Sequence, residues 1–224
     1  MKYAFLFFLS AFLSMGNMAF AQTVIEQNEP YRKCAGLSKS DPAEAMVFSE
    51  RWVKVEPSPS AFHCRGLVLF EQGHFSEAAA VLDRLSGSLT MASTVLRIGV
   101  YRQSSRAWQR AGNFPQAVER LAQAMKLVNP QRDDAINQRQ EVEILMDRAK
   151  LFNEMKKPLD SIQDLDQALT YGILKDQVLI TRARVEASNG QAELAVKDLQ
   201  EVLKENPHHE EAQALLKTIV EKKS

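Results

Sequence analysis

Small and apolar residues recur along the chain at helical spacing, and the pattern is clearest after residue 160. The nine residues that begin at Ser161 (SIQDLDQAL) align with the nine that begin at Ala195 (AVKDLQEVL). Each segment has a small residue, an apolar neighbour, a Leu at the fifth position and an apolar pair at its end. Apolar residues three or four apart share one face of a helix. The 34-residue spacing of the two segments therefore predicts a helical repeat.

Boundary signals extend this repeat toward the start of the chain. Asp41-Pro42-x-Glu44 predicts a helix start, because Asp caps a helix, Pro fits its first turn and Glu favours its positive end. Pro57 ends that helix, and Gly73 and Gly112 mark turns between later ones. Five units are predicted, from the small residues at equivalent positions: Ala45, Ala78, Ala117, Ser161 and Ala195.

Several stretches depart from the simple repeat. Ser86-Gly87-Ser88 predicts a loop, followed by a long helix over residues 90–111. A second extended helix is predicted over residues 132–155, and Lys156-Lys157-Pro158 then stands where other units have a Gly turn. After Pro207, a last helix over residues 208–222 carries one apolar stripe, which consists of Ala212, Leu215, Leu216 and Ile219. Such a helix would cap the array by covering its last apolar face.

Residues 31–209 resemble an array of tetratricopeptide repeats (TPRs). The resemblance rests on the sets Gly73/Ala78/Leu82/Leu85, Gly112/Ala117/Leu121/Ala124 and Gly190/Ala195/Leu199/Pro207. It implies an all-α fold: an α-solenoid of about five TPR-like helix-turn-helix units with a C-terminal capping helix, over residues 31–222. The chain is most similar in kind to an exported bacterial TPR protein. The resemblance specifies the architecture strongly and the function weakly, because such arrays usually serve as scaffolds.

The first 30 residues are predicted to lie outside the solenoid. Lys2 precedes an apolar run over residues 3–13, and Ala19-Phe20-Ala21 is an A-x-A arrangement. These features predict a signal peptide over residues 1–21, cleaved after Ala21, and a disordered lead-in over residues 22–30. An uncleaved anchor is the weaker alternative, because the apolar run is shorter than the ~20 residues of a spanning helix. Export without an anchor favours the periplasm of a Gram-negative bacterium, with secretion from another cell type as the alternative.

Export changes the interpretation of the two cysteines. In an oxidising compartment, an even pair of cysteines favours a disulfide over a reactive thiol or a metal site. Cys34 and Cys64 are 30 residues apart, close to one repeat, so equivalent faces of successive units would bring them together. We therefore expect a Cys34–Cys64 disulfide; two buried free cysteines are the alternative.

Charge and motifs exclude several function classes. Lys+Arg and Asp+Glu number 28 each, so no global charge favours nucleic acid or a membrane surface. The sequence has no phosphate-binding loop, zinc-type spacing or nucleophile elbow, so neither a cofactor nor an enzyme activity is predicted. Two weaker candidates are His208-His209 as metal ligands and His63 beside Cys64 as half of a thiol site. The first is better explained as a solvated helix start, and the second requires a free thiol at Cys64.

The TPR resemblance also implies a binding groove. In such arrays the first helix of each unit lines a concave surface, and the equivalent positions of units two to five are Leu67, Arg106, Lys150 and Arg184. Arg102, Arg106 and Arg110 are four residues apart, so they lie along one helix face. Arginines bind carboxylates, which favours an acidic peptide or a C-terminal carboxylate as ligand. The alternative is a solvated basic stripe that Glu143 or Glu154 partly neutralises.

These observations predict a non-catalytic scaffold or adaptor that holds a segment of another protein in its concave groove. The mature chain is predicted to bind neither nucleic acid nor to insert stably in a membrane. The alternative is an envelope-assembly or chaperone-like factor with promiscuous clients. That function would depend on the apolar groove residues Leu67, Phe70, Met146 and Ile180 rather than on the arginines.

Overall fold

The computed structural model describes residues 28–89, 94–129 and 134–223. The predicted signal peptide and residues 22–27 of the lead-in lie outside the described residues. In the described part, all regular secondary structure is helical. The helices are α2 (Glu29–Ser40), α3 (Pro42–Val55), α4 (Pro59–Glu71), α5 (Phe75–Ser88), α6 (Thr94–Arg110), α7 (Phe114–Leu127), α8 (Ala135–Glu154), α9 (Pro158–Thr170), α10 (Lys175–Ser188), α11 (Ala192–Glu205) and α12 (Glu210–Lys223).

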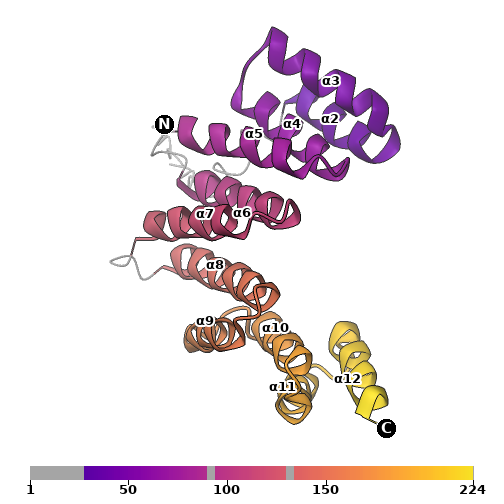
Figure 1. Ribbon diagram of the computed structural model, residues 1–224, viewed down its shortest axis with the longest axis vertical. Helices are drawn as coiled ribbons and strands as arrows, with labels where there is room; N and C mark the ends of the chain where they lie inside the picture. Colours follow the sequence, from indigo (N-terminus) through magenta and orange to yellow (C-terminus); the bar gives the residue numbers. More distant parts are fainter. Residues whose placement is uncertain (1–27, 90–93, 130–133, 224) are drawn as a thin grey trace, which may run out of the picture.

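The helices form five antiparallel pairs, and Figure 1 shows the pairs stacked in chain order along the long axis of the molecule. The pairs are α2/α3, α4/α5, α6/α7, α8/α9 and α10/α11, and α12 packs against α11 and α10. Ala212 and Ile219 of α12 are buried against the last pair. The predicted fold is confirmed: the chain is an all-α solenoid of five units with a C-terminal capping helix.

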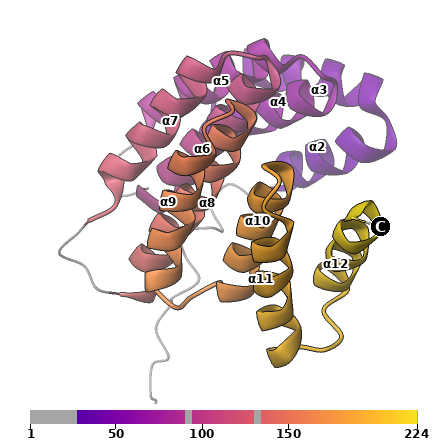
Figure 2. The same cartoon turned by 60° about the horizontal axis from the view of Figure 1, so that its bottom comes forward.

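Contacts between units show which face is concave. First helices contact the first helices of neighbouring units in the pairs α2/α4, α6/α8 and α8/α10, whereas among the described residues no comparable contacts join successive second helices. The first helices therefore lie on the inside of the curve, and the second helices form the outer layer (Figure 2).

The predicted start of the second helix is confirmed in detail. Asp41 Oδ1 accepts a hydrogen bond from the Glu44 amide at 3.0 Å, and Pro42 occupies the first turn of α3. The solenoid begins earlier than predicted, because α2 starts at Glu29 within the expected lead-in. Asn28 Oδ1 caps α2 by accepting from the Tyr31 amide at 2.7 Å, and Pro30 fits its first turn instead of ending a disordered segment.

The predicted Ser86-Gly87-Ser88 loop is wrong, since α5 continues through Ser88. The two serine hydroxyls bond to backbone carbonyls three residues earlier, Ser86 to Asp83 and Ser88 to Leu85, each at 2.8 Å. Both serines therefore fit within the helix, although they favour turns in other contexts. Residues 90–93 lie outside the described residues, so the long helix predicted from residue 90 is described from Thr94.

The turns inside the units use left-handed backbone. Gly73, Gly112 and Gly190 have φ angles of 79°, 77° and 81° in the turns of units two, three and five. In unit four the same place is taken by Lys156, with a φ of 59°. The backbone of this turn is thus retained without glycine, at a cost of about 1 kcal/mol or more for a side chain in this region.

The small residues that define the repeat lie where the two helices of each unit pack closely. Ala45, Ala78, Ala117, Ser161 and Ala195 are all fully buried. Two of these contacts also carry a hydrogen bond between helices: Ser105 Oγ donates to the Ala117 carbonyl at 2.8 Å, and Ser161 Oγ donates to the Ala149 carbonyl at 2.7 Å. A larger side chain at these positions would push the paired helices apart.

Candidate functional site

A pocket of about 340 Å³ lies between α6 and α8, the first helices of units three and four. It therefore opens on the concave face. Four basic side chains line it beside two acidic ones, so the lining is cationic; the residues are Arg102, Ser105, Arg106, Gln109, Arg110, Asp147, Lys150 and Glu154. Four of the six residues predicted to line the groove are brought together here.

Arg102 joins the two units. Its Nε donates to Asp147 Oδ2 at 2.6 Å, and its Nη1 donates to Glu143 Oε2. Burial alone would lower the pKa of Arg102, but the carboxylates of Asp147 and Glu143 outweigh it and raise that pKa above its ordinary value. Glu143 thus acts as the predicted neutralising residue, and Asp147 is a second one that the sequence analysis did not identify. The Arg102 guanidinium is committed to these contacts.

Arg106 and Lys150 present charge to the pocket more openly. The Arg106 side chain is 60% exposed, and its Nη2 lies 3.9 Å from Asp147 Oδ1, at the outer limit of an ion pair. Lys150 is exposed and forms no ion pair within the described part of the chain. Because exposed ion pairs at this distance contribute little, both cations remain available to an incoming anion.

Arg110 lies at the other end of the basic stripe. It is exposed, and its guanidinium sits over the ring of Phe75 in the preceding unit, 4.7 Å from the ring centroid. Phe75 itself packs edge-on against Phe70. Such a cation–π contact orients a guanidinium and leaves its edge nitrogens free to accept a ligand oxygen as donors.

Leu67 and Arg184, also predicted to line the groove, lie elsewhere. Leu67 is partly buried and packs against the hydrophobic cluster of the first two units. Arg184 lies toward the C-terminal end, where its Nη2 donates to Glu211 Oε1 of the capping helix at 2.8 Å. It lines a separate pocket of about 430 Å³ with Leu215 and Ile219. The predicted ladder is therefore a local cluster in units three and four.

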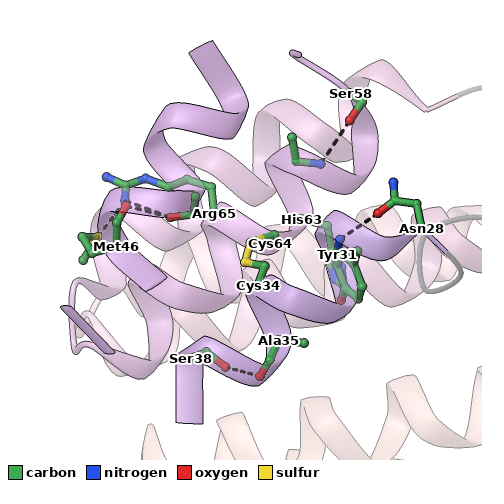
Figure 3. Close-up of a disulfide and its surroundings, with 12 residues drawn as sticks. Asn28, Tyr31, Cys34, Ala35, Ser38, Met46, Ser58, His63, Cys64 and Arg65 are labelled. Carbon is green, nitrogen blue, oxygen red and sulfur yellow. Dashed lines mark hydrogen bonds between the residues drawn. A yellow bond between two sulfur atoms is a disulfide. The ribbon is translucent and has the colours of Figure 1, made fainter. Parts of the chain in front are cut away.

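The predicted disulfide is present. Cys34 of α2 and Cys64 of α4 are bonded, with their Cα atoms 6.3 Å apart, and the bond joins the first two units (Figure 3). His63 lies beside it: its Nδ1 is 2.9 Å from the Tyr31 hydroxyl, and its Nε2 is 2.7 Å from Gln103 Oε1. Because Cys64 is paired with Cys34, it offers no thiol that His63 could activate in this structure.

A repeated ion pair between helices was missed by the sequence analysis. Arg148 binds Asp164 through two hydrogen bonds of 2.7 and 2.6 Å, and Arg182 binds Asp198 through two of 2.7 and 2.8 Å. Both pairs join residues 16 apart, and the second pair lies 34 residues after the first. This doubled spacing was a readable signal in the sequence. The pairs stabilise the packing within units four and five rather than a ligand site.

Two further searches of the described residues bear on the function classes. No group of His, Cys, Asp and Glu side chains there is arranged to hold a metal ion, and His208-His209 belongs to no such group. None of the described helices is both long enough and apolar enough to cross a membrane.

Comparison with solved structures places this architecture among known folds. A TPR protein of Thermus thermophilus superposes with a TM-score of 0.57 at 16% identity, covering 85% of this chain and 97% of that one. YrrB, a TPR protein with an unusual peptide-binding site, gives a TM-score of 0.54 at 13% identity and covers 88% and 98% of the two chains. The TPR-like repeats of a kinesin light chain homologue from Podospora anserina give 0.60 at 17%, covering 83% and 92%.

No family model matches the sequence, and no curated protein matches it. The likeness is therefore one of structure, at identities below one in five. It covers most of this chain and nearly all of the chains compared, and it agrees with the helix pairing, the glycine turns and the buried small residues. The chain has the fold of a tetratricopeptide-repeat solenoid.

Proposed function

We propose that the protein is a non-catalytic scaffold or adaptor that binds a carboxylate-bearing segment of a partner protein in the pocket between α6 and α8. The observation that carries this proposal is the pair of exposed cations, Arg106 and Lys150, on the two facing first helices. An acidic side chain or a C-terminal carboxylate between them would form charge-assisted hydrogen bonds to both units. Among proteins of the same fold, YrrB has a peptide-binding site, which supports a peptide as the kind of ligand.

The pocket has the geometry of a recognition site rather than a catalytic one. Its titratable groups are four basic side chains and two carboxylates, and Asp147 is already bound to Arg102. No His, Cys or Tyr lines it, so its lining offers no nucleophile paired with a base. Fixed donors at the ends of long side chains suit the binding of an anionic segment.

The chaperone-like alternative has less support. It depends on apolar groove residues being available to clients, but Met146 and Ile180 are 7% and 3% exposed and belong to the hydrophobic cores of units four and five. Leu67 and Phe70 are partly buried against the first units. The concave face therefore offers more charge than apolar surface in units three and four.

We also propose that the protein is exported to the periplasm after cleavage at Ala21. The signal-peptide pattern supports export, and the Cys34–Cys64 disulfide is of the kind that persists in an oxidising compartment. Mass spectrometry of the protein from the fractionated source cell would test this. A chain that begins at Gln22 with no free thiol is expected; an intact Met1 or two reduced cysteines would refute export.

A site-specific crosslink tests the adaptor function. A photo-crosslinking residue would replace Gln109 in the pocket or, as a matched control, Gln200 on the exposed outer face of α11. After irradiation in the source cell, position 109 should trap one dominant protein and position 200 should not. If both positions trap the same mixture, or if position 109 traps nothing, the groove is not the binding site.

A further inference from the structure

A second pocket lies on the outer layer of units four and five. It has a volume of about 500 Å³ and is formed by the start of α9, the end of α10 and the start of α11. Because α9 and α11 are second helices, this pocket faces away from the concave groove. Its lining includes Leu159, Ile162, Asp166, Glu186 and Leu194. This combination of apolar and acidic side chains is unlike the cationic lining of the first pocket.

Glu186 is the unusual group in this pocket. The residue is only 6% exposed, and its Oε2 atom is buried without a hydrogen-bond partner. A buried carboxylate oxygen in a folded protein almost always accepts a hydrogen bond, because leaving it without one is costly. Glu186 is therefore a buried acceptor that faces a cavity and lacks a donor.

The charged groups around Glu186 do not supply that donor. Its near neighbours are Asp166 from α9, Asp198 from α11 and Arg182 from its own helix. The Arg182 guanidinium is already engaged: Nε and Nη2 bind Asp198, at 2.7 and 2.8 Å, and Nη1 binds Asp166 at 2.6 Å. Burial and then the charge of Asp198 raise the pKa of Glu186 to about 7. A further cation at this carboxylate would be favourable.

The rim of the pocket adds an apolar requirement. Leu159 is 84% exposed and Leu194 is 49% exposed, and they flank the pocket from α9 and α11. Large apolar side chains with this exposure, placed around a concave site, are typical of contact surfaces. A ligand that satisfies both features carries a positive charge on a long stem between apolar groups.

We propose that this pocket binds a lysine or arginine side chain of a partner protein, with its cationic head on the Glu186 carboxylate and its apolar neighbours on Leu159 and Leu194. The argument is one of charge complementarity, since the buried acceptor is unsatisfied and the nearby guanidinium is occupied. The site is separate from the groove between α6 and α8. The protein would then bind one partner segment through carboxylates on its inner face and another through a basic residue on its outer face.

The test uses two synthetic peptides, acetyl-Leu-Ala-Arg-Ala-Leu-amide and the same peptide with Gln in place of Arg. Binding to the full mature chain is measured by NMR on protein with labelled glutamate carboxyl carbons, and Glu186→Gln identifies the Glu186 signal. The Arg peptide should lower the pKa of Glu186. Its affinity should be about 30-fold higher at pH 8 than at pH 5.5, because only the ionised carboxylate binds and its pKa is about 7.

The controls separate this site from other surfaces. Glu186→Gln should lose the Arg-peptide affinity at pH 8, whereas Glu119→Gln, an exposed glutamate of α7, should keep it. Equal binding of the Arg and Gln peptides, equal binding by Glu186→Gln, or no binding of the Arg peptide at millimolar concentration would overturn the proposal. Charge reversal of Arg106 and Lys150 in the concave groove should leave this titration unchanged, so the two sites can fail independently.

Discussion

The two buried aspartates of units four and five should respond differently to the same substitution. Asp164 and Asp198 are 5% exposed each, and each binds one arginine of its own unit through both carboxylate oxygens. Asn in place of either Asp keeps the shape of the side chain and removes its charge. The two sites differ in what remains for the arginine after the change.

Arg148 has no second carboxylate within hydrogen-bond distance in the described residues, whereas Arg182 keeps Asp166 at 2.6 Å. Breaking a fully buried ion pair costs about 3–5 kcal/mol. Because the Arg148 side chain is 28% exposed and can regain water, we expect Asp164→Asn to cost about 2–3 kcal/mol. For Asp198→Asn we expect about 0–1 kcal/mol, because Arg182 stays paired and a negative charge that opposes ionisation of Glu186 is removed.

Urea unfolding followed by circular dichroism would give the shift in midpoint for each variant. Hydrogen exchange of α9 and α11 would show whether the loss is local, as expected for units that contact only their neighbours. The wild-type chain and Asp160→Asn, an exposed residue of α9, serve as controls. Equal losses at the two buried sites, or a larger loss for Asp198→Asn, would refute the reasoning that the second carboxylate decides the outcome.

Four other changes follow from the same structure. Lys156→Gly should raise the free energy of unfolding by about 0.5–1 kcal/mol, because glycine adopts a φ of 59° without strain; a lower urea midpoint would contradict this. Ala117→Leu should cost about 1–3 kcal/mol by overpacking a fully buried position, and an unchanged midpoint would show that the helices can separate. Cys34→Ser with Cys64→Ser should cost roughly 3–4 kcal/mol and increase exchange in α2, whereas unchanged protection of α2 would refute a tethering role. Glu186 has a folded pKa of about 7, above that of an unfolded chain, so stability should fall as pH rises from about 4.5 to 7; Glu186→Gln should remove this fall and gain about 1–2 kcal/mol at pH 8, an amount reduced by solvent at the pocket mouth.

Much of the fold could be predicted from the sequence, because each signal had a local cause. Asp41 and Pro42 satisfy the first turn of α3 by themselves, and the glycines at positions 73, 112 and 190 take a backbone conformation that other residues avoid. The buried small residues follow from helix crossing, which repeats with the sequence. These features depend on neighbours along the chain or on a fixed period.

The errors came where tertiary contacts decide. Ser86-Gly87-Ser88 has the composition of a loop, but it continues a helix whose other residues are held by the core. The pairing of Arg102 with Asp147 depends on how units three and four stack, and a spacing of 45 residues gives no hint of it. Leu67 was assigned to the groove by counting alone, whereas packing against the first two units places it at the edge of their core.

The most direct test of the account is quantitative affinity capture of the tagged mature protein from its own compartment. The groove variant is Arg106→Glu with Lys150→Glu, which spares the structural Arg102. The control is Lys126→Glu with Lys204→Glu, two exposed lysines on the second helices α7 and α11 that give the same change in net charge. The account predicts one dominant partner, bound by the wild type and the control and lost by the groove variant. A partner retained equally by all three proteins would contradict it.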